Sequence, residues 1–240
     1  MNSFVKIYTL AAAIIFTAGT ATAEDEKKSP WDGNIDVNAL FTSGNSSQTS
    51  FGIAGKATYT GHSTSHTFSG FADFNKSSGI TDRERFGAAY NFTFDFSSRL
   101  FFSLDTSIES NKFGAFRERF ATAAGVGYRM KNTDTLSWTI EAAPSMLLTK
   151  NLDDADFISE FAAFARSAVE WQITDTTKFT NTTSAYLGGR SIVEVKSAFD
   201  FKILGSITSK VSYDILYDRD APLGRKSTDT IARVGLSYGF

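Results

Sequence analysis

Apolar and polar side chains alternate along most of this chain. The alternation is clearest in residues 229–240, where large apolar side chains are separated by glycine, serine or arginine. It recurs in residues 192–203, where valine, phenylalanine and isoleucine alternate with lysine, aspartate and glutamate. A period of two places successive side chains on opposite faces of a strand. The pattern therefore predicts strands that each have one apolar and one polar face.

About twelve such segments follow one another from Trp31 to Phe240, within a range of about ten to fourteen. They predict an all-β fold, a transmembrane antiparallel up-and-down β-barrel. An even strand number places both chain termini on the periplasmic side. Connections are expected near 61–65, 97–99, 130–135, 174–176 and 204–206 on that side, and near 44–47, 76–82, 111–117, 149–156, 188–191 and 219–227 on the extracellular side.

Two local features qualify this pattern. Pro144 lies within one alternating segment and predicts a bulge or a strand break, because proline cannot donate a ladder hydrogen bond. The extracellular connections are mostly short, and none resembles the long folded-in loop that constricts a general porin. A soluble β-sandwich would also alternate, but it would show fewer outward aromatic residues and Greek-key spacing.

The polar faces carry charges of both signs, which point into the lumen if the apolar faces meet lipid. Slipping residues 192–203 by one position would expose Lys196 and Lys202 to lipid, at about 2–4 kcal/mol per cation near the midplane. Closure of about twelve strands gives a radius of roughly 12 Å, which leaves a narrow bore. The charged lumen residues are the candidate functional residues: Arg85, Asp105, Glu109, Arg119, Arg129, Glu141, Arg166, Glu170, Lys196, Asp200 and Arg233.

The pairing of these charges decides what the lumen can do. Opposite charges locked together would plug it, whereas charges segregated by sign would leave a selective path. The two signs are close to balanced, which slightly favours a paired interior. Both a plugged barrel and a narrow pore remain open on the sequence.

The N-terminus carries an export signal. Lys6 and the apolar run after it lead to the small-residue site Ala21-Thr22-Ala23, which precedes a burst of charge. This order is typical of a secretory signal peptide. We therefore expect residues 1–23 to be a cleaved signal peptide, residues 24–30 a short periplasmic leader, and residues 31–240 the barrel in the outer membrane.

Composition narrows the function classes. The net charge of -2 gives no electrostatic case for nucleic acid. The chain has no cysteine, and therefore no disulfide framework or thiolate metal site. No cofactor is predicted. The mean hydropathy of -0.15 is compatible with a membrane barrel, because outward and inward residues average out.

Short motifs at both ends of the predicted barrel resemble a known family. Trp31 and Gly33, the turn at Ser43-Gly44-Asn45, and the last strand resemble the salt-induced outer membrane proteins, also called domain of unknown function 481. The resemblance implies an outer-membrane barrel without a characterised activity. The last strand also resembles the signal that barrel-assembly machinery reads, carried by Val234, Leu236, Tyr238 and Phe240.

Three features could carry enzyme or metal chemistry, and each has a simpler interpretation. Residues 235–239 spell G-x-S-x-G, but a nucleophile elbow needs a following helix, and the chain stops at Phe240. His62 and His66 flank a predicted turn, where a solvated role is favoured over a general base. The acidic run with Asp153, Asp154 and Asp156 lacks the glycine and distal glutamate of a calcium loop, so it predicts a solvated loop.

The sequence therefore favours a small non-enzymatic outer-membrane barrel with a role in envelope integrity or stress tolerance, and a narrow ion or small-solute channel is one form of that role. Its expected partners are outer-membrane lipids, lipopolysaccharide, the barrel-assembly machinery and a small solute or ion. A lipase-like or protease-like enzyme and a surface ligand-binding barrel are the alternatives. The histidine positions argue against the enzyme, and the short loops argue against the ligand-binding barrel.

Overall fold

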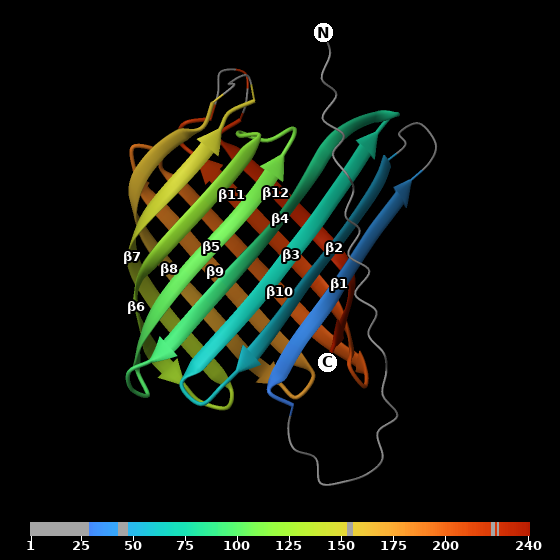
Figure 1. The fold of residues 1–240 in the computed structure, drawn as a ribbon. Helices are drawn as coiled ribbons and strands as arrows, with labels where there is room; N and C mark the ends of the chain where they lie inside the picture. The colour runs from blue at the N-terminus through green and yellow to red at the C-terminus, as the bar shows by residue number, and fades with distance from the viewer. Residues whose placement is uncertain (1–28, 43–47, 153–155, 222–223, 225) are drawn as a thin grey trace.

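The computed structural model describes residues 29–42, 48–152, 156–221, 224 and 226–240, which form a closed barrel of twelve antiparallel strands (Figure 1). The all-β barrel prediction is confirmed. The strands are β1 (Trp31–Thr42), β2 (Gln48–Thr60), β3 (Thr64–Ser77), β4 (Ile80–Asp95), β5 (Leu100–Asn111), β6 (Glu118–Asn132), β7 (Leu136–Lys150), β8 (Ile158–Thr174), β9 (Thr177–Gly188), β10 (Ile192–Leu204), β11 (Ile207–Asp218) and β12 (Thr228–Gly239).

Every strand pairs with its neighbours in sequence, and β1 pairs with β12 to close the barrel. Trp31 and Gly239 therefore lie at the same end, which we call the terminal end, and the connection 112–117 lies at the opposite, loop end. The assignment of these ends to periplasm and exterior stays a prediction. The described connections agree with the predicted ones to within a few residues.

The closing seam between β1 and β12 is short. It runs from Asn34 opposite Gly239 to Asn38 opposite Gly235. Beyond it, Gly33 and Phe240 exchange two backbone hydrogen bonds, each of 3.0 Å. At Gly235 a Cβ atom would lie 2.3 Å from the carbonyl oxygen of Val37, so glycine is needed for the strands to approach here. Gly235 thus serves the closure of the barrel and belongs to no nucleophile elbow.

Pro144 neither breaks β7 nor shifts its register, contrary to the prediction. β7 is continuous from Leu136 to Lys150. Its pairing with β6 passes from Ser145 opposite Ala123 to Ala142 opposite Val126 in one register. The missing backbone donor of Pro144 thus affects only the ladder positions beside it. The pairing on both sides holds the rest of the strand in register.

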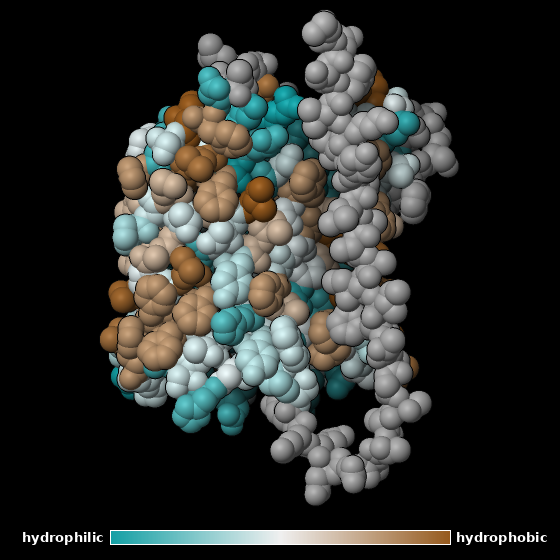
Figure 2. Space-filling model, viewed as in Figure 1, coloured by the Kyte–Doolittle hydropathy of each residue, from teal (hydrophilic) through white to brown (hydrophobic). Residues whose placement is uncertain are grey.

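The outer wall is apolar. Large side chains such as Phe86, Ile108 and Phe161 are exposed there, and Figure 2 shows apolar side chains over much of the wall with hydrophilic ones gathered near its two ends. The four side chains of the predicted assembly signal also lie exposed on this wall. No helix among the described residues is long and apolar enough to cross a membrane.

His66 lies in this outer wall rather than in a solvated turn, which corrects the interpretation from sequence. It belongs to β3, and its ring packs beside Tyr59 and Phe92, with centroids 6.2 and 5.0 Å away. Its Nδ1 lies 2.9 Å from the hydroxyl of Tyr90. Trp31 extends this aromatic cluster, with its ring 5.3 Å from that of Tyr59. Aromatic residues of this kind form the girdles of membrane barrels.

The interior is filled on one side only. Ala121, Leu147 and Ile192 form one buried cluster, against which Tyr186 and Leu216 pack. A second cluster comprises Ala123, Ala143 and Phe164, also against Tyr186. The strands β6 to β10 thus enclose an apolar core within the barrel, whereas the polar-inside alternation predicts a uniformly polar lumen.

The connection 112–117 adds to this filling. Although it is short, it buries Ala115 and places Phe116 in the interior, where the Phe116 side chain has 0% exposure. The guanidinium carbon of Arg119 lies 3.6 Å from the centre of the Phe116 ring. A short connection therefore fills part of the lumen in this barrel.

Candidate functional site

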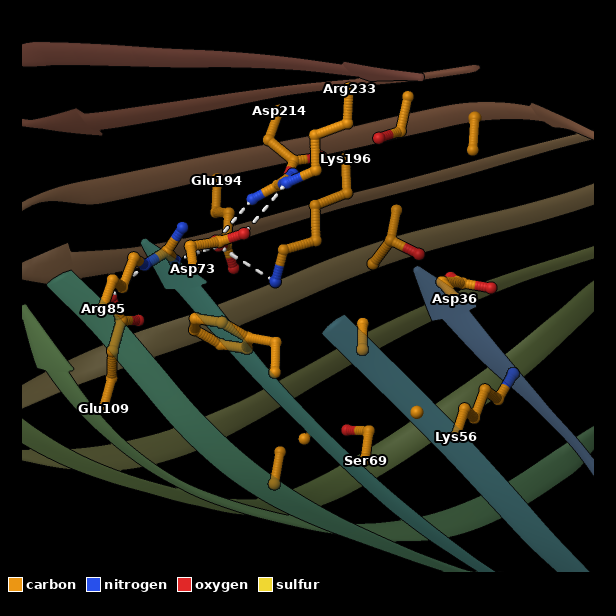
Figure 3. Close-up of a pocket in the computed structure, with 18 of the residues that line it drawn as sticks. Asp36, Lys56, Ser69, Asp73, Arg85, Glu109, Glu194, Lys196, Asp214 and Arg233 are labelled. Atoms are coloured by element: carbon orange, nitrogen blue, oxygen red, sulfur yellow. Dashed lines mark hydrogen bonds and ion pairs between the residues drawn. The ribbon is translucent and has the colours of Figure 1, made fainter. Parts of the chain in front are cut away.

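The other side of the lumen contains a cavity of about 510 Å³ (Figure 3). Its walls come mainly from β1 to β5 and β9 to β12, and it borders the apolar core at Ala121, Tyr186 and Ile192. Serine, threonine and asparagine side chains line it together with charged residues. These charged groups are organised by ion pairs, and several of those pairs cross the lumen.

Arg85 on β4 contacts charged residues on two other strands, β5 and β10. Its Nε donates to Glu109 on the adjacent β5 at 2.6 Å, and its Nη2 lies 3.6 Å from Glu194 on β10, across the lumen. The guanidinium also stacks over Phe71, 4.6 Å from the ring centre. Because β4 and β10 are on opposite sides of the barrel, the Arg85–Glu194 pair forms a crossbar in the lumen.

Arg233 on β12 makes a second link beside the crossbar. It donates to Asp73 on β3 at 2.6 Å and to Asp214 on β11 at 2.5 Å. Figure 3 shows Arg233, Asp73 and Glu194 converging in the same part of the cavity. Asp73 is three strands away from Arg233 around the barrel, so this pair bridges the closing seam from inside.

Two lysines are the most exposed cations of the cavity. Lys196 lies 3.0 Å from Glu194, and its side chain is 47% exposed. Lys56 on β2 lies 3.8 Å from Glu170 on β8, and its side chain is 50% exposed. The Lys56–Glu170 pair is exposed on both sides and contributes little to stability. The two ammonium groups therefore remain accessible to a solute in the cavity.

A smaller cavity of about 120 Å³ lies on the loop side of the crossbar. It is lined by Asp82, Arg83 and Asp229, and it shares Arg85, Glu194 and Asp214 with the larger cavity. The crossbar residues thus stand between two cavities in series. Their side chains line both cavities.

A separate ion network holds the filled side together. Arg166 on β8 donates to Asp105 on β5 at 2.5 Å and to both oxygens of Glu141 on β7, at 2.8 and 2.7 Å. The Nδ2 of Asn91 also donates to Asp105, at 2.9 Å. These groups are largely buried, so their charges are mutually compensated rather than available to a solute.

A further cluster ties the loop end together around Asp218, which is 1% exposed. Arg119 donates to its carboxylate at 3.0 Å and Arg190 at 2.7 Å. Arg190 also donates to Asn151 at 3.0 Å, which links the connection after β9 to the one after β7. Because Phe116 packs under Arg119, the cluster anchors the inward loop as well.

The structure places all eleven charge candidates from sequence on the inner side, but in different environments. Arg85, Glu109, Arg119, Lys196 and Arg233 line the larger cavity. Asp105, Glu141 and Arg166 form the filled-side network, and Arg129 pairs with Asp95 at 2.6 Å. Glu170 and Asp200 lie near Lys56 and Lys210. Their functional role stays a prediction.

Sequence reasoning missed several residues of the site. Arg190 sits in a loop after two glycines, and nothing in the pattern assigns it to the interior. The interior position of Phe116 could not be predicted either, because a loop has no alternating pattern that would place its residues. Asp36 accepts a hydrogen bond from Lys210 at 2.7 Å. It lies on an alternating polar face and could have been included from the pattern alone.

The residues considered for metal and hydrolase chemistry lie in different parts of the structure. Within the part of the chain that the structure describes, no group of three or more acidic or histidine side chains is placed to hold a metal ion. Asp153 and Asp154 lie outside the described residues, and Asp156 is exposed. His66 contacts aromatic rings and Tyr90 on the outer wall, away from the lumen.

Fold and site together define the class: a closed barrel with an apolar outer wall and a charged lumen, the architecture of outer-membrane β-barrels. Residues 35–240 match the family described as protein of unknown function, DUF481, and the chain belongs to this family. The resemblance drawn from the end strands is thereby confirmed. One relative is the uncharacterized protein YdiY of Escherichia coli (strain K12), 25% identical over 237 residues, which cover 99% of this chain and 92% of that protein.

Solved porins have a similar fold. The NanC porin, in a rhombohedral crystal form, has a TM-score of 0.50 and 12% identity, covering 86% of this chain and 98% of that one. The KdgM porin in complex with disordered oligogalacturonate has a TM-score of 0.48 and 11% identity, covering 86% and 99%. At such identities the likeness concerns the fold alone.

Proposed function

We propose that this protein is a non-enzymatic barrel of the outer membrane that acts as a narrow channel for small polar solutes or ions. The observation that carries the proposal is the pair of cavities in series, which meet at Arg85 and Glu194. A cavity of about 510 Å³ lies within the size range of small-molecule sites, roughly 300–1,000 Å³. The channel would contribute to envelope integrity or stress tolerance.

The outer-membrane location rests on two supports. The outer wall is apolar with an aromatic cluster near the terminal end, which suits a lipid environment. The sequence of residues 1–23 predicts a cleaved signal peptide, followed by the leader 24–30. The exposed side chains of Val234, Leu236, Tyr238 and Phe240 would then be read by the assembly machinery, and the outer wall would contact lipids and lipopolysaccharide.

Single-channel recording tests the channel. The purified full-length protein is refolded, shown to migrate differently on a gel with and without heating, and inserted into a planar bilayer. Discrete conductance steps smaller than those of a general porin are expected, because the apolar core, Phe116 and the crossbar occupy much of the lumen. A correctly folded barrel that gives no steps would contradict the channel.

The same ion pairs favour a second candidate, a closed structural barrel. Arg85–Glu194 joins opposite walls, and Arg166 ties three strands together. A barrel braced in this way could strengthen the envelope without passing solute. Silence in the bilayer, together with envelope leakage in cells that lack the protein, would favour this role.

A further inference from the structure

The two cavities of the lumen differ in net charge among the described residues that line them. Residues that line only the larger cavity include five cations and three anions: Lys56, Arg119, Lys196, Lys210 and Arg233 against Asp36, Asp73 and Glu109. Three of these cations also face carboxylates that do not line the cavity, since Arg119 pairs with Asp218, Lys56 with Glu170 and Lys210 with Asp200. Those that line only the smaller cavity are Asp82, Asp229 and Arg83, a surplus of one negative charge. The shared residues Arg85, Glu194 and Asp214 add another negative charge.

The positive charge of the larger cavity is available to a solute. Its arginines are largely buried and already donate to carboxylates, as Arg233 does to Asp73. Lys56 and Lys196 are about half exposed instead, and Lys56 lies 3.8 Å from Glu170, beyond hydrogen-bond distance. Figure 3 shows the two lysines on different walls of the cavity. An ammonium group with free donors in a cavity can donate hydrogen bonds to the carboxylate of a solute.

The smaller cavity offers the opposite chemistry. Asp82 is exposed and receives one amide hydrogen bond, from Asn75 at 2.5 Å, so its carboxylate keeps further capacity to accept. Asp229 is partly exposed in the same cavity. A small cation or an ammonium group would therefore be favoured on the loop side of the crossbar.

We propose that the two cavities select small dipolar solutes, which carry an ammonium and a carboxylate group on one short skeleton. This inference rests on the proposed channel function and specifies its substrate class. A simple cation is attracted by one segment and repelled by the other, and a simple anion meets the reverse. A dipolar solute can orient its ammonium toward the smaller cavity and its carboxylate toward Lys196, which lies 3.0 Å from the shared residue Glu194. At the crossbar, Arg85 and Glu194 present both charges within 3.6 Å of each other.

Glycine and glycolamide test the proposal, because they are isomers of equal mass and only glycine is dipolar. Their entry into liposomes that contain the full-length protein is followed by swelling, and the rates of protein-free liposomes are subtracted. Glycine is expected to enter at least about threefold faster. Equal rates, or faster glycolamide, would overturn the selectivity while leaving the channel standing. Absence of entry for both isomers would overturn the channel and the selectivity together.

Substitutions locate the selectivity. In the double variant Lys56→Gln with Lys196→Gln, the ratio of glycine to glycolamide entry is expected to fall toward 1. The matched control is Lys112→Gln, since Lys112 pairs with Glu84 at 3.0 Å and lines neither cavity. The control should keep the wild-type ratio. A double variant that keeps it too would overturn the assignment to the lysines.

Ion selectivity gives an independent measurement that needs no variant. In a planar bilayer with a gradient of potassium chloride, the reversal potential is expected near zero, because the two segments oppose each other. A strong preference for either ion would show that one segment dominates. That result would overturn the proposal.

Discussion

Arg85 on β4 and Glu194 on β10 approach to 3.6 Å although they lie on opposite sides of the barrel. The pair is held from both walls, because Arg85 also donates to Glu109 at 2.6 Å and Glu194 also pairs with Lys196 at 3.0 Å. Such a crossbar reduces the bore without any long loop. Removal of these side chains is therefore a test of function.

Replacing Glu194 with Gln is expected to raise the single-channel conductance. The change removes the charge that draws Arg85 across the lumen, while Arg85 keeps its hydrogen bond to Glu109 and is not left as an unpaired buried charge. Stability should therefore change little, which heat-modifiable migration on a gel checks. Single-channel recording in a planar bilayer measures the effect.

The matched control for this change is Glu84→Gln. Glu84 lies on the same strand as Arg85, but it pairs with Lys112 at 3.0 Å and lines neither cavity. Its substitution should leave the conductance steps as they are. Equal conductance in the Glu194 variant and the wild type would mean that the crossbar does not limit the passage.

Arg166→Met is expected to lower the free energy of unfolding by about 3–5 kcal/mol, because it leaves Asp105 and Glu141 buried without their cation. Urea unfolding of the refolded barrel, followed by tryptophan fluorescence, measures the loss. Arg129→Met is the comparison, since the Arg129–Asp95 pair is more exposed and should cost about 0–1 kcal/mol. Similar losses in the two variants would contradict the special role of the Arg166 network.

Much of the fold and of the charge pairing could be predicted from the sequence. Alternation places most of the charged residues on the inner side, and the inward charges already differ in sign between neighbouring strands. Asp73 on β3 precedes Arg85 on β4, and Glu109 on β5 follows. Antiparallel pairing brings such neighbours together, as Asp73 opposite Arg85 shows. This order explains why many of the inward charges are paired.

The remaining features depend on contacts between residues distant in sequence. Phe116 fills the lumen because Arg119 and its neighbours provide a partner there, which no local pattern records. Leu147 sits between two other apolar residues, so alternation does not say that it joins Ile192 inside the barrel. His66 lies on the outer wall because β3 begins two residues earlier, closer to the turn than its polar neighbours suggested.

Val211→Lys is expected to destabilise the barrel in lipid by about 2–4 kcal/mol, because Val211 is exposed on the outer wall near the middle of β11. The adjacent Ser212 lines the larger cavity, so Ser212→Lys places the same charge in the lumen and should cost under about 1 kcal/mol. Unfolding in urea with phospholipid vesicles compares the two variants. Equal losses would argue that this wall does not face lipid.

Gly235→Ala is expected to impair closure of the barrel. The new Cβ would lie 2.3 Å from the carbonyl oxygen of Val37, and the obstacle is backbone in the short seam between β1 and β12, so it cannot turn aside as a side chain would. Overpacking of this kind typically costs about 1–3 kcal/mol.

Gly239→Ala is the matched control in the same strand, because the nearest neighbour of its new Cβ would be 3.8 Å away. The fraction of protein that migrates as a folded band without heating measures closure. That fraction should fall for Gly235→Ala and stay unchanged for Gly239→Ala, and a parallel fall in both would mean that the strand as a whole, rather than the approach at Gly235, limits closure.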